Sequence, residues 1–119
     1  MIMRNITTNN MSNESKIKRV IVRPLKKWED ERGWLSEIWR TDEMEADHQP
    51  VMTYISVTKP SVARGPHEHV HQTDLFGFLG PSTFRLHLWD NRQDSETYGL
   101  HETFDVGADN PTVSIIPPG

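Results

Sequence analysis

The chain has 119 residues, enough for one domain with one hydrophobic core, and the absence of cysteine excludes a disulfide framework and thiolate chemistry. A formal net charge of −4 without a basic stripe argues against nucleic acid as a partner. Only 34% of the residues are hydrophobic, so we expect either a loose segment or a partner subunit that completes apolar burial.

The first 16 residues differ in composition from the rest of the chain. They are rich in Asn, Ser and Thr without hydrophobic periodicity, so we expect a mobile tail over residues 1–16 and one domain over residues 17–119. The first residues lack the apolar centre of a signal peptide, and no segment has the apolar length of a membrane span. The default expectation is a soluble cytoplasmic protein without a membrane partner.

Short β-type segments separated by turn residues fill the first half of the domain. Residues 20–24 are rich in Val and Ile and end at a proline, which predicts a strand. Residues 30–33 predict a turn and residues 34–39 a second strand. Residues 41–50 are acidic and predict a surface loop, whereas the β-branched and aromatic residues of 51–58 predict a third strand.

The second half of the domain continues the same pattern. Strands are predicted over residues 75–79, 83–90, 100–106 and 112–116. The strand over 83–90 alternates clearly, with an apolar face of Phe84, Leu86 and Leu88 and a polar face of Arg85, His87 and Trp89. Since no window shows a helical period, the fold class we predict is all-β, an antiparallel sandwich or barrel.

Three of the six histidines alternate at His67, His69 and His71, after an Arg64-Gly65-Pro66 turn. In an extended strand these three side chains would share one face. Imidazole is the usual general base and a usual metal ligand near neutral pH. The pattern therefore predicts a functional site, with the three histidines on one strand that faces the interior.

Four motifs follow one another in a fixed order: residues 30–37 (DERGWLSE), residues 64–67 (RGPH), residues 90–99 (DNRQDSETYG) and residues 116–119 (IPPG). Over residues 20–119 this order resembles the dTDP-4-dehydrorhamnose 3,5-epimerase family. The resemblance implies a cupin-type jelly roll, or β-sandwich, that acts on nucleotide-linked 4-keto-6-deoxy sugars. In that family the fold continues for several strands past the last motif, so we expect the jelly roll here to be incomplete at its C-terminus.

The resemblance also implies roles for particular residues. Arg32 and Glu37 match positions that contact the nucleotide of the neighbouring subunit through an exchanged N-terminal strand, which implies a homodimer. Arg64 matches an arginine that holds the diphosphate, a task that suits the guanidinium fork. His67 matches the catalytic base. No cofactor is implied.

The chain departs from the family at one important position. The family has a lysine near the enolate oxygen about ten residues after the catalytic histidine, but this chain has no lysine after Lys59. Arg64 or a protonated His69 could supply the missing positive charge.

Three alternatives stay open at this stage. The pair of His67 and His69, separated by Glu68, would also fit a related sugar-nucleotide 3,4-ketoisomerase, in which both imidazoles move protons. A metal-dependent cupin enzyme would use His67, His69 and Asp74 as ligands, although we expect no tightly bound metal. The missing lysine motivates a non-catalytic cupin that only binds a sugar nucleotide. His71 and His87 receive no role, and His87 either lines the barrel or faces solvent.

Overall fold

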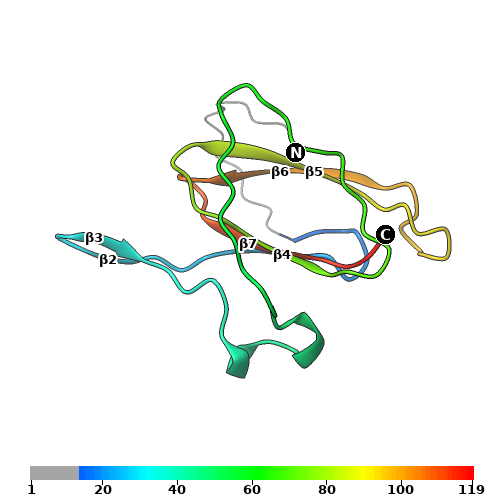
Figure 1. Cartoon of the computed structure of the whole chain (residues 1–119), viewed down its shortest axis with the longest axis horizontal. Helices are drawn as coiled ribbons and strands as arrows, with labels where there is room; N and C mark the ends of the chain where they lie inside the picture. Colours follow the sequence, from blue (N-terminus) through cyan, green and yellow to red (C-terminus); the bar gives the residue numbers. More distant parts are fainter. Residues whose placement is uncertain (1–13) are drawn as a thin grey trace.

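Seven β-strands and two short 3-10 helices make up the part of the chain that the structure describes, which is residues 14–119 of a computed structural model (Figure 1). The elements are β1 (Ile21–Pro24), β2 (Trp28–Asp30), β3 (Gly33–Leu35), η1 (Thr41–Glu43), η2 (Ala46–His48), β4 (Asp74–Phe78), β5 (Thr83–Trp89), β6 (His101–Gly107) and β7 (Thr112–Ile116). All strand pairs are antiparallel. The predicted all-β class is confirmed, and the arrangement is consistent with a cupin-type β-fold.

Two sheets enclose the hydrophobic core (Figure 1). One sheet has β7 between β1 and β4, and the other pairs β5 with β6. The predicted alternation along β5 is confirmed, since Leu86 and Leu88 are buried. They pack with core residues from three other strands, Val22, Phe78 and Val106. The core thus joins both sheets, and strands far apart in the sequence depend on it together.

The hairpin formed by β2 and β3 projects away from the sandwich (Figure 1). The turn predicted at residues 30–33 is present, and the backbone φ of +132° at Gly33 suits a glycine. The strand predicted over residues 34–39 ends early, at Leu35. Both strands are exposed along their whole length, and Trp28 and Leu35 leave 56% and 61% of their surface accessible. A lone two-stranded hairpin is marginally stable, so we expect this hairpin to pack on a partner surface.

Two predicted strands are absent from the described residues. Residues 51–58 form no strand, and Val51, Ile55 and Val57 are almost fully exposed. Residues 67–71 also form no strand, and their three histidines are exposed rather than directed into the interior. Both predictions are wrong for the same physical reason: each segment has strand-like side chains, but neither finds a neighbouring backbone with which to form a ladder of hydrogen bonds.

The predicted tail lies mostly outside the described residues, which begin at residue 14, so the expected tail boundary stays a prediction. Within the described part, Glu102 of β6 anchors the segment. Ser15 donates a hydrogen bond of 2.6 Å to its carboxylate, and the backbone N–H of Lys16 donates one of 2.9 Å. Residues 14–119 contain no helix that is long and apolar enough to cross a membrane.

A buried carboxylate closes the loop between β5 and β6. Asp90 is 2% exposed and accepts hydrogen bonds from Arg92 Nε (2.8 Å), Ser95 Oγ (2.6 Å) and Thr97 Oγ1 (2.6 Å). Arg92 also donates to the carbonyl of Lys18 at 2.7 Å. The Arg92 guanidinium, helped by the two hydroxyl groups, holds the pKa of Asp90 well below its usual range despite burial. This cluster therefore fixes the loop to the N-terminal segment.

The outer face of β5 and β6 carries a flat group of rings. His87 Nδ1 lies 3.1 Å from His101 Nε2, and the two rings differ in orientation by only 8° with centroids 5.3 Å apart. This geometry means that the imidazoles share one hydrogen bond edge to edge in nearly one plane. Trp89 lies parallel to His101 at 4.6 Å. His87 thus lies on the face opposite to Leu86 and Leu88, away from the core.

We expect Asp90→Asn to lower the free energy of unfolding by roughly 3 kcal/mol or more, because it leaves the largely buried Arg92 guanidinium without its counter-charge. Urea unfolding would measure the loss. The matched control is Asp42→Asn, which breaks an exposed 2.7 Å pair with Arg40 and should cost far less, because solvent screens an exposed pair. Equal losses in the two variants would contradict the importance of the buried cluster.

The environment of His87 predicts a pH dependence of stability. Burial first, and then the positive charges of His101 and Arg85, lower the pKa of His87 from its ordinary value of 6.5. The folded state therefore resists a proton that the unfolded chain accepts, and stability falls as the pH decreases below 6.5. Urea unfolding at about pH 8 and about pH 5 should show a smaller decrease in His87→Gln than in the wild type. His71→Gln, which changes an exposed loop histidine, is the control, and an unchanged decrease in His87→Gln would refute the assignment.

Candidate active site

Most of the predicted site residues lie in the loop over residues 64–73, which leads directly into β4 of the sandwich. Arg64 begins this loop, and its side chain is held in place. Its Nε donates a hydrogen bond of 2.7 Å to Thr58 Oγ1, which is largely buried, and its Nη2 donates one of 3.0 Å to the carbonyl of Val57. The predicted diphosphate-binding arginine is therefore positioned by the preceding segment.

His67 follows a glycine that the local geometry requires. Gly65 has a φ of +107°, and a Cβ at this position would lie 3.3 Å from the backbone nitrogen of His67 and 3.4 Å from its ring. The His67 side chain is exposed and forms no hydrogen bond or ion pair with other residues in the range 14–119. Its imidazole is thus accessible to a ligand, as a catalytic base must be.

His69 has a carboxylate partner. Its Nε2 lies 3.2 Å from Oδ2 of Asp74, the first residue of β4. The other carboxylate oxygen, Oδ1, accepts a hydrogen bond of 2.6 Å from the side-chain amide of Gln72. The structure therefore joins two of the predicted candidates, His69 and Asp74, in one local cluster.

The backbone around the histidines is fixed from a distant part of the chain. Asn91, next to the buried Asp90, donates a side-chain hydrogen bond of 3.2 Å to Glu68. The carbonyl of His69 accepts a hydrogen bond of 2.9 Å from the backbone of Gly119, whose own carbonyl accepts one of 3.0 Å from Asn91. Sequence reasoning missed this support, although Asn91 lies inside the Asp90-x-Arg92 motif.

The alternative metal ligands do not come together. Among residues 14–119, the ligand atoms of His67 do not join those of His69 and Asp74 in a group that could hold an ion. The one group of three possible ligands in this range is Glu45, Asp47 and His48, on and beside η2. It lies at the surface, where acidic groups are common without an ion.

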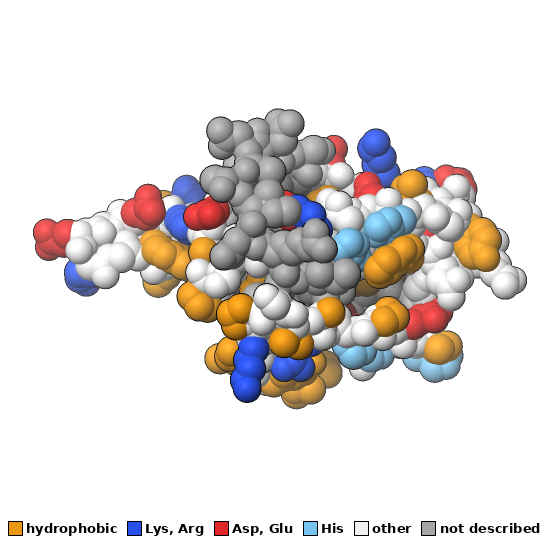
Figure 2. Space-filling view, turned by 90° about the horizontal axis from the view of Figure 1, so that it is seen from above, with side chains coloured by type: hydrophobic (Ala, Val, Ile, Leu, Met, Phe, Trp, Pro, Cys, Tyr) orange, Lys and Arg blue, Asp and Glu red, His pale blue; other side chains and the backbone are white. Residues whose placement is uncertain are grey.

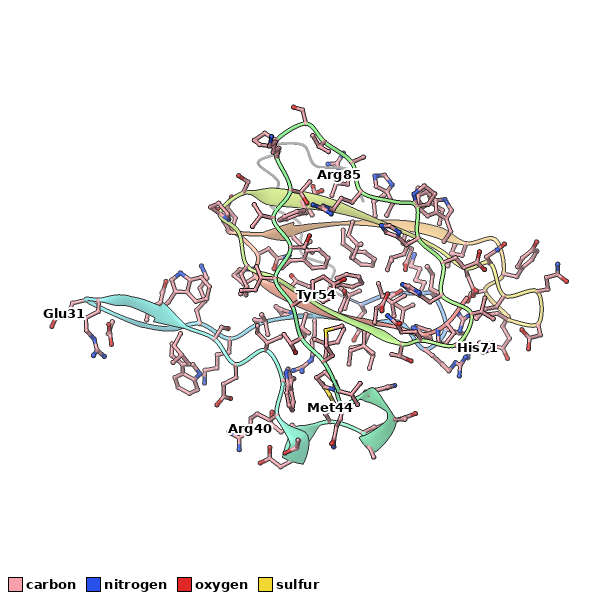
Figure 3. All side chains as sticks on the ribbon, in the orientation of Figure 1. Glu31, Arg40, Met44, Tyr54, His71 and Arg85 are labelled. Carbon is pink, nitrogen blue, oxygen red and sulfur yellow. The ribbon has the colours of Figure 1, made fainter. Side chains whose placement is uncertain are left out.

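The predicted nucleotide contacts lie elsewhere in the chain. Arg32 is paired with Asp30 at 2.6 Å in the hairpin, and Glu37 lies 3.3 Å from Arg40. Figure 3 shows the hairpin tip, at Glu31, and the histidine loop, at His71, at opposite ends of the molecule. One chain alone therefore does not bring Arg32 to the histidines. Histidine side chains lie exposed beside hydrophobic ones on the surface (Figure 2).

Two curated proteins give the comparison with known relatives. The chain is 37% identical over 99 residues to the "Probable low-salt glycan biosynthesis epimerase Agl13" of Haloferax volcanii, covering 82% of this chain and 63% of the relative. It is 35% identical over 100 residues to the "Spore coat polysaccharide biosynthesis protein SpsL" of Bacillus subtilis, covering 84% and 65%. The chain thus spans slightly less than two thirds of each relative. No solved structure is significantly similar.

The family comparison covers almost all of the described chain. Residues 14–119 match the sequence model of the family described as dTDP-4-dehydrorhamnose 3,5-epimerase. This range includes the hairpin, the histidine loop and every strand of the sandwich. The chain belongs to the dTDP-4-dehydrorhamnose 3,5-epimerase family.

Proposed function

We propose that the protein is a sugar-nucleotide epimerase that removes a proton next to the ketone of a nucleotide-linked 4-keto-6-deoxy sugar, with His67 as the base. Family membership over residues 14–119 is the observation that carries this proposal. The accessible imidazole of His67 and the fixed guanidinium of Arg64 support it. The reaction needs both a base and a positively charged group that binds the diphosphate of the substrate.

The chemistry requires a base and stabilisation of the enolate. A proton next to a ketone can be removed by a positioned imidazole if positive charge or hydrogen bonds stabilise the enolate oxygen. This chain has no lysine after Lys59 for that purpose. In our proposal Arg64 or protonated His69 takes that role, and Arg32 and Glu37 contact the nucleotide from a second subunit.

The names of the two relatives support a proposal on the biological setting, because both refer to glycan or polysaccharide biosynthesis. We extend this to the present chain and propose that it supplies an epimerised deoxysugar nucleotide, of the dTDP-rhamnose type, for surface polysaccharide synthesis in the cytoplasm.

A second candidate function is binding without catalysis. The absence of a lysine after Lys59 favours it, because neither an arginine nor a histidine replaces a lysine isosterically. In this case Arg64 and the hairpin residues would hold a sugar nucleotide that stays unchanged.

Deuterium exchange distinguishes the two functions. Incubation with a dTDP-4-keto-6-deoxyhexose in D₂O should place deuterium at C3, at C5 or at both, detected by NMR or mass spectrometry. His67→Ala should lower the exchange rate by at least about 10²-fold, because the C–H bond then lacks its base. Arg64→Ala should mainly weaken binding, since the diphosphate is bound in the ground state and transition state alike.

The controls make each outcome of this experiment decisive. His71→Ala removes a neighbouring exposed histidine that has no proposed role, and it should leave exchange unchanged. Binding of the sugar nucleotide without any deuterium incorporation would favour the non-catalytic function. Neither binding nor exchange would mean that only the fold is shared with the family.

We also propose a homodimer in which the hairpin of β2 and β3 packs on a second subunit. The exposed Trp28, Trp34 and Leu35 of the hairpin support this, as do the exposed Val51 and Ile55. Apolar surface of this extent on separate segments is typical of an unfilled interface.

Sedimentation velocity should therefore show a dimer at micromolar concentration. Leu35→Glu, which places a charge on the exposed apolar face of the hairpin, should shift the protein towards monomer. Glu31→Gln at the hairpin turn is the control and should leave the dimer intact. A wild-type protein that stays monomeric at high concentration would contradict strand exchange.

A further inference from the structure

The His69–Asp74 pair has a property that the other loop histidines lack. Among residues 14–119, neither His67 nor His71 has a carboxylate partner, whereas His69 Nε2 lies 3.2 Å from Asp74 Oδ2. Gln72 holds the second oxygen of the same carboxylate at 2.6 Å. Of the three alternating histidines, only His69 therefore has its ring oriented by a charged group.

Asp74 is also placed to orient the ring rather than to meet a ligand. It begins β4 and is paired with Ile116 of β7, so its backbone belongs to the three-stranded sheet. Its side chain is 20% exposed, compared with 44% for His69. The carbonyl of His69 is held by the backbone of Gly119 at 2.9 Å. The carboxylate thus lies behind the imidazole, and the imidazole has the greater access to solvent.

We propose that Asp74 is a positioning residue that makes His69 a second proton-transfer group of the site. The proposal rests on the proposed function. With Nε2–H directed at the carboxylate, the free nitrogen of the ring is Nδ1, which has no partner among residues 14–119. A carboxylate that fixes the tautomer and the orientation of an imidazole is an established arrangement for acid–base catalysis. Its 3.2 Å separation suits the looser geometry of ligand-free sites.

The proton balance of the step is simple. His67 removes the proton from the carbon next to the ketone, and the C–H electron pair moves into the enolate. His69, as the imidazolium, then gives its Nδ1 proton to the same carbon from the other side, and the ketone re-forms with inverted configuration. Both imidazoles return to their starting states by exchange with water. Asp74 keeps its negative charge throughout and touches neither the substrate nor the reacting atoms.

The positioning role of Asp74 agrees better with the contacts around the histidine loop than a metal site does. His67, His69 and Asp74 do not gather into one ligand group within the described residues. The carboxylate oxygens of Asp74 are occupied by His69 and Gln72, so an ion would have to displace at least one of them. The positioning of the His69 imidazole by Asp74 requires no change in these contacts.

The first test measures the tautomer and needs no substrate. In ¹⁵N-labelled protein, at a pH high enough to leave the imidazoles neutral, NMR should show His69 mainly as the Nε2–H tautomer, with the signals assigned by their loss in His69→Gln. In Asp74→Asn this preference should be lost, whereas Asp109→Asn, an exposed aspartate in the turn after β6, should leave it unchanged. A mixed tautomer in the wild type, or the same tautomer in Asp74→Asn, would overturn the pairing.

The second test measures catalysis. In the D₂O experiment, Asp74→Asn should lower kcat for exchange by about 10²-fold with little change in KM, and Asp74→Glu should recover part of the loss. Unfolding midpoints and circular dichroism of each variant check that β4 is retained. Exchange by Asp74→Asn at the wild-type rate would overturn the role of Asp74.

The two tests separate failure of this inference from failure of the proposed function. If the wild type exchanges no deuterium, the epimerase function and the catalytic part of the inference fall together, whatever the tautomer. If the wild type exchanges but Asp74→Asn is unimpaired, the epimerase function stands and the inference alone fails.

Discussion

The buried carboxylate of Asp90 is the constraint on which the position of the candidate site depends. A carboxylate that is 2% exposed would cost several kcal/mol without compensation, so its loop must supply the donors found in residues 92–97. Asn91 is consequently fixed at the end of β5, where its side chain holds Glu68, the residue between His67 and His69 of the candidate site. An electrostatic requirement in the sandwich thus determines where a distant loop lies.

The strands of the sandwich could be predicted from the sequence because their alternation coincides with burial. Leu86 and Leu88 fall on one face of β5 and become core, as the period of two requires. Residues 51–58 carry the same kind of side chains but form no strand. Alternation states which face of a strand is apolar, and it contains no information on whether another backbone is available to pair with it. That information is tertiary, which is why this segment and the histidine loop were predicted incorrectly.

The candidate site divides in the same way between what the sequence contains and what only the fold supplies. The motifs identified His67, His69 and Arg64 as residues of interest, since residue type and order suffice for that. The groups that hold these residues in place could not be derived from the sequence. Asp74 was considered as a metal ligand, but its distance to His69 depends on how the loop enters β4. The contact from Asn91 depends on a loop more than twenty residues away in sequence.

The hairpin of β2 and β3 and the segment over residues 51–58 both leave apolar side chains exposed to solvent. Trp28 and Leu35 on the hairpin leave more than half of their surface accessible, and so does Ile55 on the loop segment. Each Å² of apolar surface removed from water contributes about 25 cal/mol, so an interface that covers both segments would stabilise the protein substantially. Under the proposed strand exchange, the same contact would bring Arg32 from one subunit towards the histidine loop of the other, which a single chain keeps at its far end. Covering these two apolar segments and completing the nucleotide site would then be one event, and a monomer would lack both.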